Sequence, residues 1–311
     1  MNAPKTKLII GTRGSALARW QAEHIAARLI EAHPGLVVEF SIIVTEGDRF
    51  QAGPLVEVGG KAVWVKEIEV ALAAGKVDLA VHSLKDVPTE LAAGLALVAI
   101  PRRADPRDAL VTRTGGDLAS LPAGARVGTS SLRRVCQLLA LRPDLKVEVL
   151  RGNVDTRLRK VEEGVVDAAL LACAGLDRLG YGARIAERIA IGQMVPAIGQ
   201  GALALEARAD DRGTRGLVAA LADDEAALTV AAERALLAGL GGSCRTPIGG
   251  HATISGDHMV VRGLVGSPDG KEILRDQVEG AAADAVTLGR MLAAQLREKG
   301  ADRILAQAAS G

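Results

Sequence analysis

Two stretches of this chain of 311 residues follow the same order of strands and helices, and this repeat limits the fold more than any other feature. The first stretch predicts strands at 7–11, 37–45 and 77–83, with helices between them at 15–31 and 63–74. The second stretch predicts strands at 126–128, 145–150 and 166–173, again separated by helices. Strands that alternate with helices pair in parallel, so each stretch predicts an α/β lobe.

Short sequence matches suggest that the two lobes are related. Gly11-Thr12 is followed by Ser and Leu, as is Gly128-Thr129, and Gly75–Asp78 (GKVD) matches Gly164–Asp167 (GVVD). The alternative is that both lobes use the turn sequences common to βαβ units. Two such lobes commonly face each other across a cleft, where small molecules bind.

A third region follows the lobes. Segment 201–207 reads as a strand that returns to the first lobe, and the pattern then changes to a helix at 225–240, short strands and a last helix at 282–299. We therefore expect domain 1 at 1–101 and 200–220, domain 2 at 102–199, and a small α+β domain 3 at 221–311.

Composition argues against several classes of function. The net charge is +1 and aromatic residues make up 2%, which does not suit a nucleic-acid-binding surface. No apolar run reaches the ~18 residues of a membrane helix, and the N-terminal run is too short for a signal peptide. Three widely spaced cysteines fit a reducing cytoplasm, and with five histidines they form no metal-ligand spacing.

Arginines gather just after the predicted strands. They are Arg13, Arg133, Arg134, Arg151, Arg157 and Arg178. Open α/β sheets bind ligands at the carboxyl ends of their strands, and guanidinium groups bind carboxylates and phosphates as planar forks. A single one of these arginines is most simply a solvated helix end. Six at equivalent positions predict a rim that binds a ligand with several carboxylates or phosphates.

Lys85 and Asp86 stand side by side where the apolar run VDLAVH and the Ser-Leu after it end. A salt bridge or a turn is the simplest structural interpretation. Among cationic neighbours Asp86 stays ionised, so it would pair with a cationic amine or stabilise a developing positive charge. Lys85 would add one more contact to an anion.

Cys244 lies in a glycine-rich turn, GGSCRTP, whereas Cys136 and Cys173 lie in apolar runs and are expected in the core. The turn predicts an exposed thiol, which is either idle or a nucleophile or covalent anchor. The sequence shows no histidine-based dyad, which argues against a protease-like role.

Seven motifs, in order along nearly the whole chain, resemble the porphobilinogen deaminase (hydroxymethylbilane synthase) family. They are IIGTRGSALARWQA, VGGKAVWVKEIE, VHSLKDVP, GTSSLRR, RGNVDTRL, GQGALALE and GGSCRTPIG. The resemblance implies an α/β fold with two lobes like periplasmic binding proteins around a cleft, plus a small C-terminal α+β domain that carries the cysteine.

The resemblance also implies a transferase of tetrapyrrole (porphyrin, haem) biosynthesis. Four porphobilinogen molecules lose ammonia and join head to tail into hydroxymethylbilane, on a dipyrromethane cofactor held by a thioether to Cys244. Asp86 would be the catalytic residue, and the cofactor would contact Lys85, Asp86, Ser131, Arg133 and Arg134. The substrate-binding residues would be Arg13, Ser15, Lys61, Thr129, Ser130, Arg151, Arg157 and Arg178.

The chain departs from the family pattern at Glu46, Glu57 and Trp64, where a basic residue, a lysine and a phenylalanine are usual. These changes affect only the expected role of loop 46–62, which we interpret as a lid with Lys61 as its functional member. One alternative is a two-lobed binding module for an anionic small molecule, and another is an enzyme that uses Cys244 as a nucleophile. We expect a cytoplasmic monomer without nucleic-acid or membrane partners.

Overall fold

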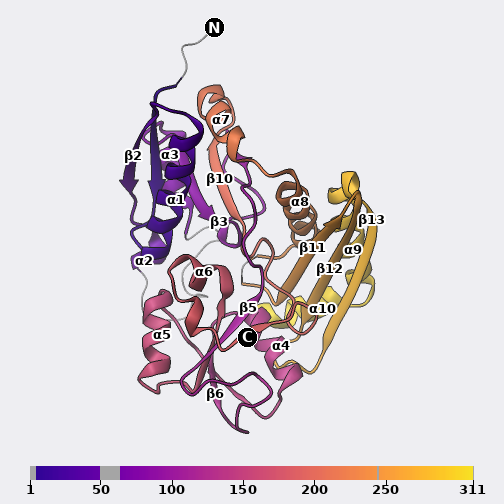
Figure 1. Ribbon diagram of the computed structural model, residues 1–311. Coiled ribbons are helices and arrows are strands. Elements are labelled where there is room, and N and C mark those ends of the chain that lie inside the picture. Colours follow the sequence, from indigo (N-terminus) through magenta and orange to yellow (C-terminus); the bar gives the residue numbers. More distant parts are fainter. Residues whose placement is uncertain (1–4, 50–63, 244, 311) are drawn as a thin grey trace. The chain divides into compact units, whose positions relative to one another are not determined.

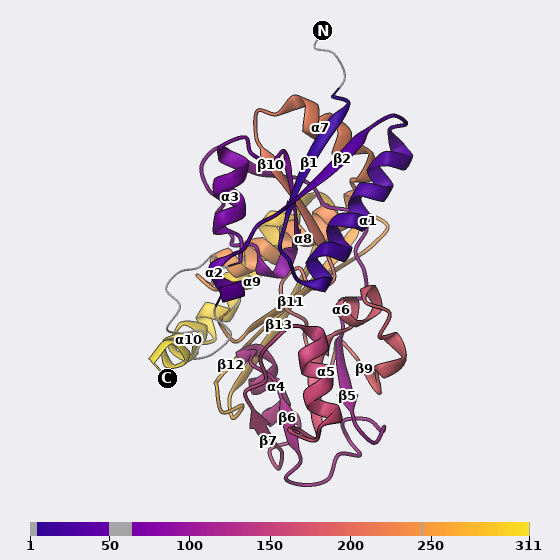
Figure 2. The same cartoon turned by 90° about the vertical axis from the view of Figure 1, so that its left-hand side faces the viewer.

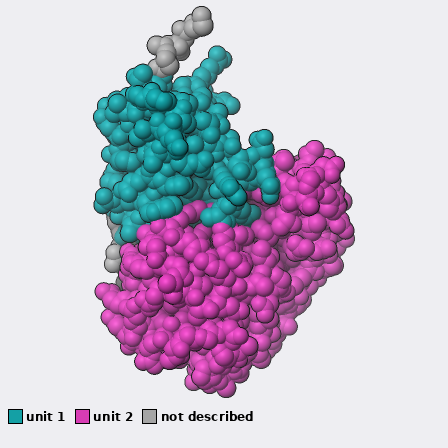
Figure 3. Space-filling model, in the orientation of Figure 1, with its two compact units in different colours: residues 1–104, 202–227 teal, residues 105–201, 228–311 magenta. Residues whose placement is uncertain are grey.

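The computed structural model describes residues 5–49, 64–243 and 245–310. The chain divides into two compact units, one of residues 1–104 and 202–227 and the other of residues 105–201 and 228–311 (Figure 3). It therefore crosses from one unit to the other at 104/105, 201/202 and 227/228.

The sheet of the first unit has five strands in the order β2-β1-β3-β10-β4 (Figure 1). The bounds are Lys7–Thr12 for β1, Val37–Ile42 for β2, Leu79–Ser83 for β3, Leu95–Ala99 for β4 and Leu203–Arg208 for β10. Strand β1 pairs in parallel with β2 and β3, as the alternating pattern predicted. Strand β10 runs antiparallel between β3 and β4, which confirms that the chain returns to the first lobe.

Helices cover both faces of this sheet (Figure 2). They are α1 (Ala16–Ala32), α3 (Lys66–Ala73) and α7 (Arg212–Val218), with the short α2 (Glu46–Arg49) and 3-10 helices at Leu84–Asp86 and Ala219–Leu221. The predicted apolar stripe of α1 is buried, from Ala18 to Leu29, and packs on the sheet residues Leu8 and Leu79. Helix α3 packs on the opposite face, where Leu72 meets Ala80.

The sheet of the second unit repeats this order as β7-β6-β8-β5-β9. Its strands are β5 (Asp108–Thr112), β6 (Arg126–Gly128), β7 (Lys146–Glu148), β8 (Ala168–Ala172) and β9 (Glu187–Ile189). Its helices are α4 (Leu132–Leu141), α5 (Val154–Glu162) and α6 (Cys173–Arg178), with a 3-10 helix at Gly182–Arg184. In each sheet the antiparallel fourth strand, β5 or β10, is the one that the chain enters directly after crossing between units.

The two lobes share detailed contacts as well as strand order. Asp78 Oδ2 accepts the N–H of Ile9 on β1 at 2.8 Å, and Asp167 Oδ2 accepts the N–H of Arg126 on β6 at 2.8 Å. Three residues before each aspartate a glycine lies at positive φ, in the left-handed region that favours glycine. These contacts favour a structural repeat over a chance use of common turns.

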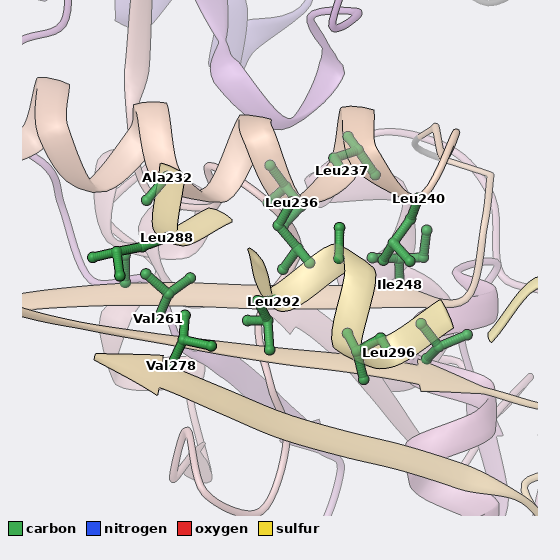
Figure 4. Close-up of a cluster of buried hydrophobic side chains, with 14 of the residues drawn as sticks. Ala232, Leu236, Leu237, Leu240, Ile248, Val261, Val278, Leu288, Leu292 and Leu296 are labelled. Atoms are coloured by element: carbon green, nitrogen blue, oxygen red, sulfur yellow. The ribbon is translucent and has the colours of Figure 1, made fainter. Parts of the chain in front are cut away.

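The C-terminal region forms a three-stranded antiparallel sheet of β11 (Ile248–Ser255), β12 (His258–Gly266) and β13 (Ile273–Ala281). Helices α8 (Asp224–Gly239) and α9 (Ala285–Glu298) share a core with it, and a 3-10 helix, Ala282–Asp284, leads into α9. Figure 4 shows Leu288, Leu292 and Leu296 on α9 within this core, together with Leu236 of α8 and Val261 of β12.

The helix predicted at 282–299 is confirmed as α9, but the prediction that it is the last helix was wrong. A further helix, α10 (Ala301–Ser310), follows α9. Gly300 separates the two with φ 99°, a conformation that ends a helix and is open to glycine. The buried Ala301 and Ile304 of α10 belong to the C-terminal core.

The C-terminal sheet also packs against the second lobe. Cys136 of α4, Val195 and Leu264 of β12 form one buried cluster, and a Cβ placed on Gly266 would lie 2.6 Å from Cys136 Sγ. One unit therefore holds both the second lobe and the C-terminal sheet. The expected fold class, two α/β lobes with a small C-terminal α+β region, is confirmed, whereas the three-domain boundaries stay a prediction.

Helices α8 and α9 approach closely at Gly289, where a Cβ would lie 2.1 Å from the Ala232 carbonyl oxygen. We expect Gly289→Ala to lower the free energy of unfolding by about 1–3 kcal/mol, because the helices must move apart. Urea unfolding measures this. The matched control is Gly216→Ala on α7, where nothing lies within 4 Å of the added Cβ. The control should stabilise by about 0.5–1 kcal/mol through helix propensity alone, and equal effects of both changes would contradict the close approach.

Candidate active site

Lys85 and Asp86 lie on a 3-10 helix that directly follows β3, and both are half-buried. In that helix Leu84 is buried, and its N–H donates to the segment that leads into β10 at 3.1 Å. One residue earlier, Ser83 Oγ accepts a hydrogen bond from Gln21 Nε2 of α1 at 2.9 Å. The turn is thus held from two sides. It fixes an ammonium and a carboxylate at the carboxyl end of a buried strand.

Arg13 follows β1 and is already paired inside the first unit. Its Nε donates to the two carboxylate oxygens of Asp48 at 3.1 and 3.2 Å, and its Nη2 contacts the same carboxylate. Its guanidinium carbon lies 4.2 Å from the centroid of the Trp64 ring. Burial raises the pKa of Asp48, but Arg13 outweighs it, so this pKa lies below its ordinary value. A ligand carboxylate would have to share Arg13 with Asp48. Nearby, Ser15 caps α1 by accepting the N–H of Ala18 at 3.3 Å.

Arg133 and Arg134, expected on a rim, are instead 3% and 5% exposed. Both lie in the first turn of α4 and contact Asp108, which is fully buried at the start of β5. Arg133 Nη1 lies 2.6 Å from Asp108 Oδ2, and Arg134 Nη2 lies 2.8 Å from Asp108 Oδ1. Each guanidinium also donates to a backbone carbonyl, that of Val195 or Leu170. The sequence analysis did not single out Asp108.

The arginine cluster, defined as Asp108, Arg133 and Arg134, carries one more positive than negative charge. Burial raises the pKa of Asp108, but the two guanidinium groups reverse this and hold it well below its ordinary value. Burial lowers the pKa of Arg134. Arg133 Nε is buried and has no hydrogen-bond partner among the described residues. An excess buried cation is unfavourable without a counter-charge, so the cluster favours a nearby anion.

The backbone around Thr129–Ser131 adds to this preference for negative charge. Thr129 is buried, its N–H donates to the Glu148 carbonyl at 2.9 Å, and its Oγ1 accepts the N–H of Ser131 at 3.3 Å. Ser131 is the N-cap residue of α4, yet its side chain makes no capping hydrogen bond. Ser130 is half-buried beside it. The positive end of the helix dipole and the hydroxyl groups therefore lie at the same strand end as the arginine cluster.

Arg178 is a partly buried cation at the end of α6. Its Nη2 donates to the Gly201 carbonyl at 2.7 Å, and no carboxylate pairs with it among the residues that the structure describes. Burial lowers its pKa to about 10. Arg151 follows β7, and Arg157 lies on α5 with its Nε bonded to the Gly152 carbonyl at 2.8 Å. All three follow parallel strands of one sheet, as the sequence predicted.

A buried acidic cluster of Glu69, His82 and Glu206 was not found by the sequence analysis. His82 Nε2 lies 2.9 Å from Glu206 Oε2 between β3 and β10, and Glu206 Oε1 has no partner in the described parts of the chain. Burial, and then the charge of Glu206, raise the pKa of Glu69 on α3. The only signal in the sequence was a glutamate inside the apolar strand LALEA.

Three of the discussed positions, Cys244, Lys61 and Glu57, lie outside the described residues. Beside Cys244, the N–H of Ser243 donates to Thr246 Oγ1 at 3.1 Å, and the Thr246 hydroxyl donates to the Ser243 carbonyl at 2.7 Å. The other two cysteines are buried, as expected. Burial raises the pKa of Cys136 to about 11 and of Cys173 to about 12, so both remain neutral thiols at pH 7.

The residues of the second unit fit a cofactor that carries several carboxylates. The arginine cluster has an excess positive charge, Arg133 has an orphaned buried N–H, and α4 has an N-terminus without a side-chain cap. Each feature favours a negatively charged group. Among the described residues, no three His, Cys, Asp or Glu side chains are grouped so as to hold a metal ion.

Comparison with known families identifies the chain. The model described as "Porphobilinogen deaminase, dipyromethane cofactor binding domain" matches residues 8–216, and the one described as "Porphobilinogen deaminase, C-terminal domain" matches residues 227–298. The chain belongs to the porphobilinogen deaminase family. Two relatives named porphobilinogen deaminase match this deaminase-family chain along nearly its whole length. The relative from Roseiflexus sp. is 51% identical over 302 residues, 97% of this chain and 99% of the relative. The relative from Syntrophotalea carbinolica is 52% identical over 299 residues, 96% of this chain and 95% of the relative.

Solved structures with a similar arrangement of elements are more distant from this deaminase-family chain. A YaeC-family lipoprotein from Enterococcus faecalis has a TM-score of 0.43 and 12% identity, covering 72% of this chain and 94% of its own. The periplasmic VFT2 domain of BvgS from Bordetella pertussis has a TM-score of 0.40 and 18% identity, covering 70% and 86%. Within the described ranges, no helix is long and apolar enough to cross a membrane.

Asp108→Asn tests the central charge of the cluster. We expect it to lower the free energy of unfolding at pH 7 by about 3–5 kcal/mol, because two guanidinium groups lose their buried counter-charge. Since the pKa of Asp108 is lowered in the folded state, its stabilisation is complete above the unfolded value of about 3.9 and is lost as the pH falls through the folded value. Urea unfolding should therefore show a constant difference between wild type and variant from about pH 8 to 5, shrinking below about pH 4. A difference that grows with acidification would contradict this account.

Proposed function

We propose that the protein is a hydroxymethylbilane synthase, a transferase of tetrapyrrole biosynthesis that joins four porphobilinogen molecules head to tail with release of ammonia. The observation that carries the proposal is the match of both family models in order, together with relatives named porphobilinogen deaminase that are about half identical over nearly the full length.

The second unit carries a partly buried cation, which suits a substrate that is bound through its carboxylate groups. Porphobilinogen carries an acetate and a propionate, and Arg178 is a partly buried cation without a paired carboxylate among the described residues. Ligand carboxylates would replace the missing counter-charge and accept charge-assisted hydrogen bonds. We assign substrate binding to Arg178 with the residues Arg13, Ser15, Lys61, Thr129, Ser130, Arg151 and Arg157.

We assign the attachment of the dipyrromethane cofactor to Cys244. A thioether requires an accessible, reactive sulfur, and burial keeps Cys136 and Cys173 as neutral thiols. When bound, the cofactor supplies the pyrrole primer to which the first substrate unit is added. Ser131, Arg133, Arg134 and Lys85 would hold its carboxylates, as the excess positive charge of the arginine cluster suggests.

Asp86 is the proposed catalytic carboxylate. Loss of ammonia from porphobilinogen leaves a cationic electrophile, and attack by a pyrrole carbon creates a second cation, so both steps need a fixed negative charge. The 3-10 turn after β3 carries Asp86 and supplies this negative charge at a fixed place. The carboxyl group can also pass a proton to the leaving amine. Lys85, next to it, would hold an acid group of the substrate.

We further propose that the enzyme is a cytoplasmic monomer without membrane or nucleic-acid partners. Three widely spaced cysteines, of which Cys136 and Cys173 are free thiols, suit a reducing compartment. A net charge of +1 offers no general attraction to nucleic acid or anionic lipid. Light scattering after size-exclusion chromatography would measure the oligomeric state.

The covalent cofactor is tested by the intact mass of the denatured protein. We expect wild type to exceed the mass of the bare chain by two deaminated pyrrole units, located on the Cys244 peptide, and Cys244→Ser to lack this excess. Cys136→Ser is the matched control and should keep it, because that thiol is buried. A bare wild-type mass that incubation with porphobilinogen does not change would favour the alternative of a two-lobed binding module.

Replacement of the Asp86 carboxylate tests the proposed chemistry. We expect Asp86→Asn to lower kcat by about 100- to 10,000-fold, because the fixed charge and the proton donor are both lost. The free energy of unfolding should change little, since no side-chain partner of Asp86 is found among the described residues. Asp86→Glu keeps the charge and should retain more activity than the asparagine variant. A kcat for Asp86→Asn within threefold of wild type would remove Asp86 from the mechanism.

A further inference from the structure

Gln200 connects the arginine cluster to two of the three segments where the chain crosses between the units. Its side chain is 1% exposed, and its Nε2 donates to Asp108 Oδ1 at 3.0 Å and to the Pro106 carbonyl at 2.7 Å. Pro106 lies just after the first crossing of the chain between units, and Gln200 lies just before the second. One amide group therefore joins the first and second crossing segments to the carboxylate that holds Arg133 and Arg134.

The two residues beside Gln200 are also held, each by a different part of the same unit. The Gly201 carbonyl accepts a hydrogen bond from Arg178 Nη2 at 2.7 Å. The Gly199 N–H donates to Glu233 Oε2 of α8 at 2.7 Å, and Glu233 Oε1 accepts the N–H of Ala252 on β11 at 2.9 Å. The segment 199–201 is thus hydrogen-bonded to Arg178 of α6, to Asp108 of the arginine cluster and to Glu233 of α8. Glu233 in turn bonds the C-terminal sheet.

The hydrogen bonds of Asp108 explain why Gln200 matters to the arginines. Oδ1 accepts from Gln200, from Arg134 Nε at 3.0 Å and Nη2 at 2.8 Å, and from Arg133 Nη2 at 3.2 Å, whereas Oδ2 accepts from Arg133 Nη1. A carboxylate held by this many donors has one orientation. Without the Gln200 amide, Asp108 keeps its four bonds to the guanidinium groups but loses the bond that ties its Oδ1 to the segment around residue 200. Asp108 and the two guanidinium groups can then shift together relative to the ligand. A displacement of about 1 Å in a binding fork is enough to weaken binding substantially.

We propose that Gln200 and Asp108 are positioning residues for ligand carboxylates. They act through Arg133 and Arg134 and do not touch the ligand. Because Gln200 also bonds Pro106, the geometry of the two arginines depends on the conformation of the crossing segments. This inference rests on the proposed function of the same site.

Gln200→Leu tests the proposal. We expect a KM for porphobilinogen about tenfold higher, with kcat within about threefold, because the substrate binds next to the cofactor that Arg133 and Arg134 hold, and a misplaced cofactor weakens substrate binding. Covalent uptake of the cofactor by apoprotein, followed by intact mass, should slow in parallel. This second readout does not depend on activity of the loaded enzyme.

Gln137→Leu is the matched control. Gln137 is fully buried on the same helix as the two arginines, and its three hydrogen bonds go to the backbone of Arg133 and Val195, not to Asp108. Its loss should lower the urea midpoint and leave KM within about twofold. If both variants raise KM alike, or if Gln200→Leu changes only the urea midpoint, Gln200 is merely structural and the proposal is wrong.

Gln200→Glu gives a second test that preserves volume. The new carboxyl group would face Asp108, with Arg133 and Arg134 on the far side of that carboxylate and Glu233 bonded to the preceding residue. Two facing carboxyl groups share one proton, which raises the pKa of one of them. At low pH the protonated group donates to Asp108 as the amide does, and at high pH its charge repels Asp108.

The variant's KM should therefore be close to that of wild type near pH 6.5 and rise about tenfold relative to wild type by about pH 9. A constant ratio across this range would refute the positioning role. Failure of the proposed function looks different: wild-type protein would then release no ammonia from porphobilinogen and carry no added mass, and the inference would fall with it.

Discussion

The burial of two guanidinium groups against one carboxylate is the interaction on which the second unit depends. Without Asp108, neither Arg133 nor Arg134 is tolerable at 3% and 5% exposure. With it, the first turn of α4 is fixed to β5, and the same helix carries Cys136 into the contact with the C-terminal sheet. One carboxylate leaves an unbalanced positive charge, which makes the cluster suitable for binding an anion as well as for holding the fold.

The two lobes share one arrangement of strands but carry different chemical groups where the strands end. Both have an equivalent order of five strands. In both, an aspartate just before a parallel strand, β3 or β8, accepts a backbone N–H of the neighbouring strand, β1 or β6. The side chains at the strand ends differ. After β3 the first unit presents Lys85 and Asp86, whereas after β8 the second unit presents α6, which ends at Arg178. The shared frame fixes where strand ends lie, and the residues placed there decide what each lobe does.

Much of this architecture was predictable because it is encoded locally. The spacing of apolar residues gave α1 and the parallel strands, and the helix predicted from residue 15 begins at Ala16, directly after its cap residue Ser15. Strands β4, β5 and β9 were missed, because short apolar runs without a helix between them carry no clear period. The end of α9 was predicted correctly, but helix α10 after Gly300 was missed.

The partners of the candidate site residues were not predictable, since they come from distant parts of the sequence. Arg133 and Arg134 were found by their place after a strand, but their burial follows from Asp108, which is 25 residues away on a strand that was missed. His82 and Glu206 are separated by 124 residues and meet only because β10 returns to pair with β3. A sequence pattern shows which residues follow a strand. It does not show which charges the folded sheet brings beside them.

The two buried clusters differ in the charged side chains that predominate in them, arginines in one and glutamates in the other, and this suits the two demands of the proposed reaction. In the second unit two arginines share one aspartate, which favours the carboxylates of the ligand. In the first unit Glu206 is hydrogen-bonded to His82, which lies four residues before Asp86, and the charge of Glu206 raises the pKa of Glu69. The raised pKa of Glu69 shows that burial and Glu206 both oppose its ionisation, as in carboxyl groups that compete for one counter-charge. Carboxylates such as Asp86 at the end of β3 favour a developing positive charge, whereas the arginine cluster of the second unit favours carboxylates. A substrate that carries acid groups and forms a cation as it reacts needs both kinds of group, and each unit supplies one of them.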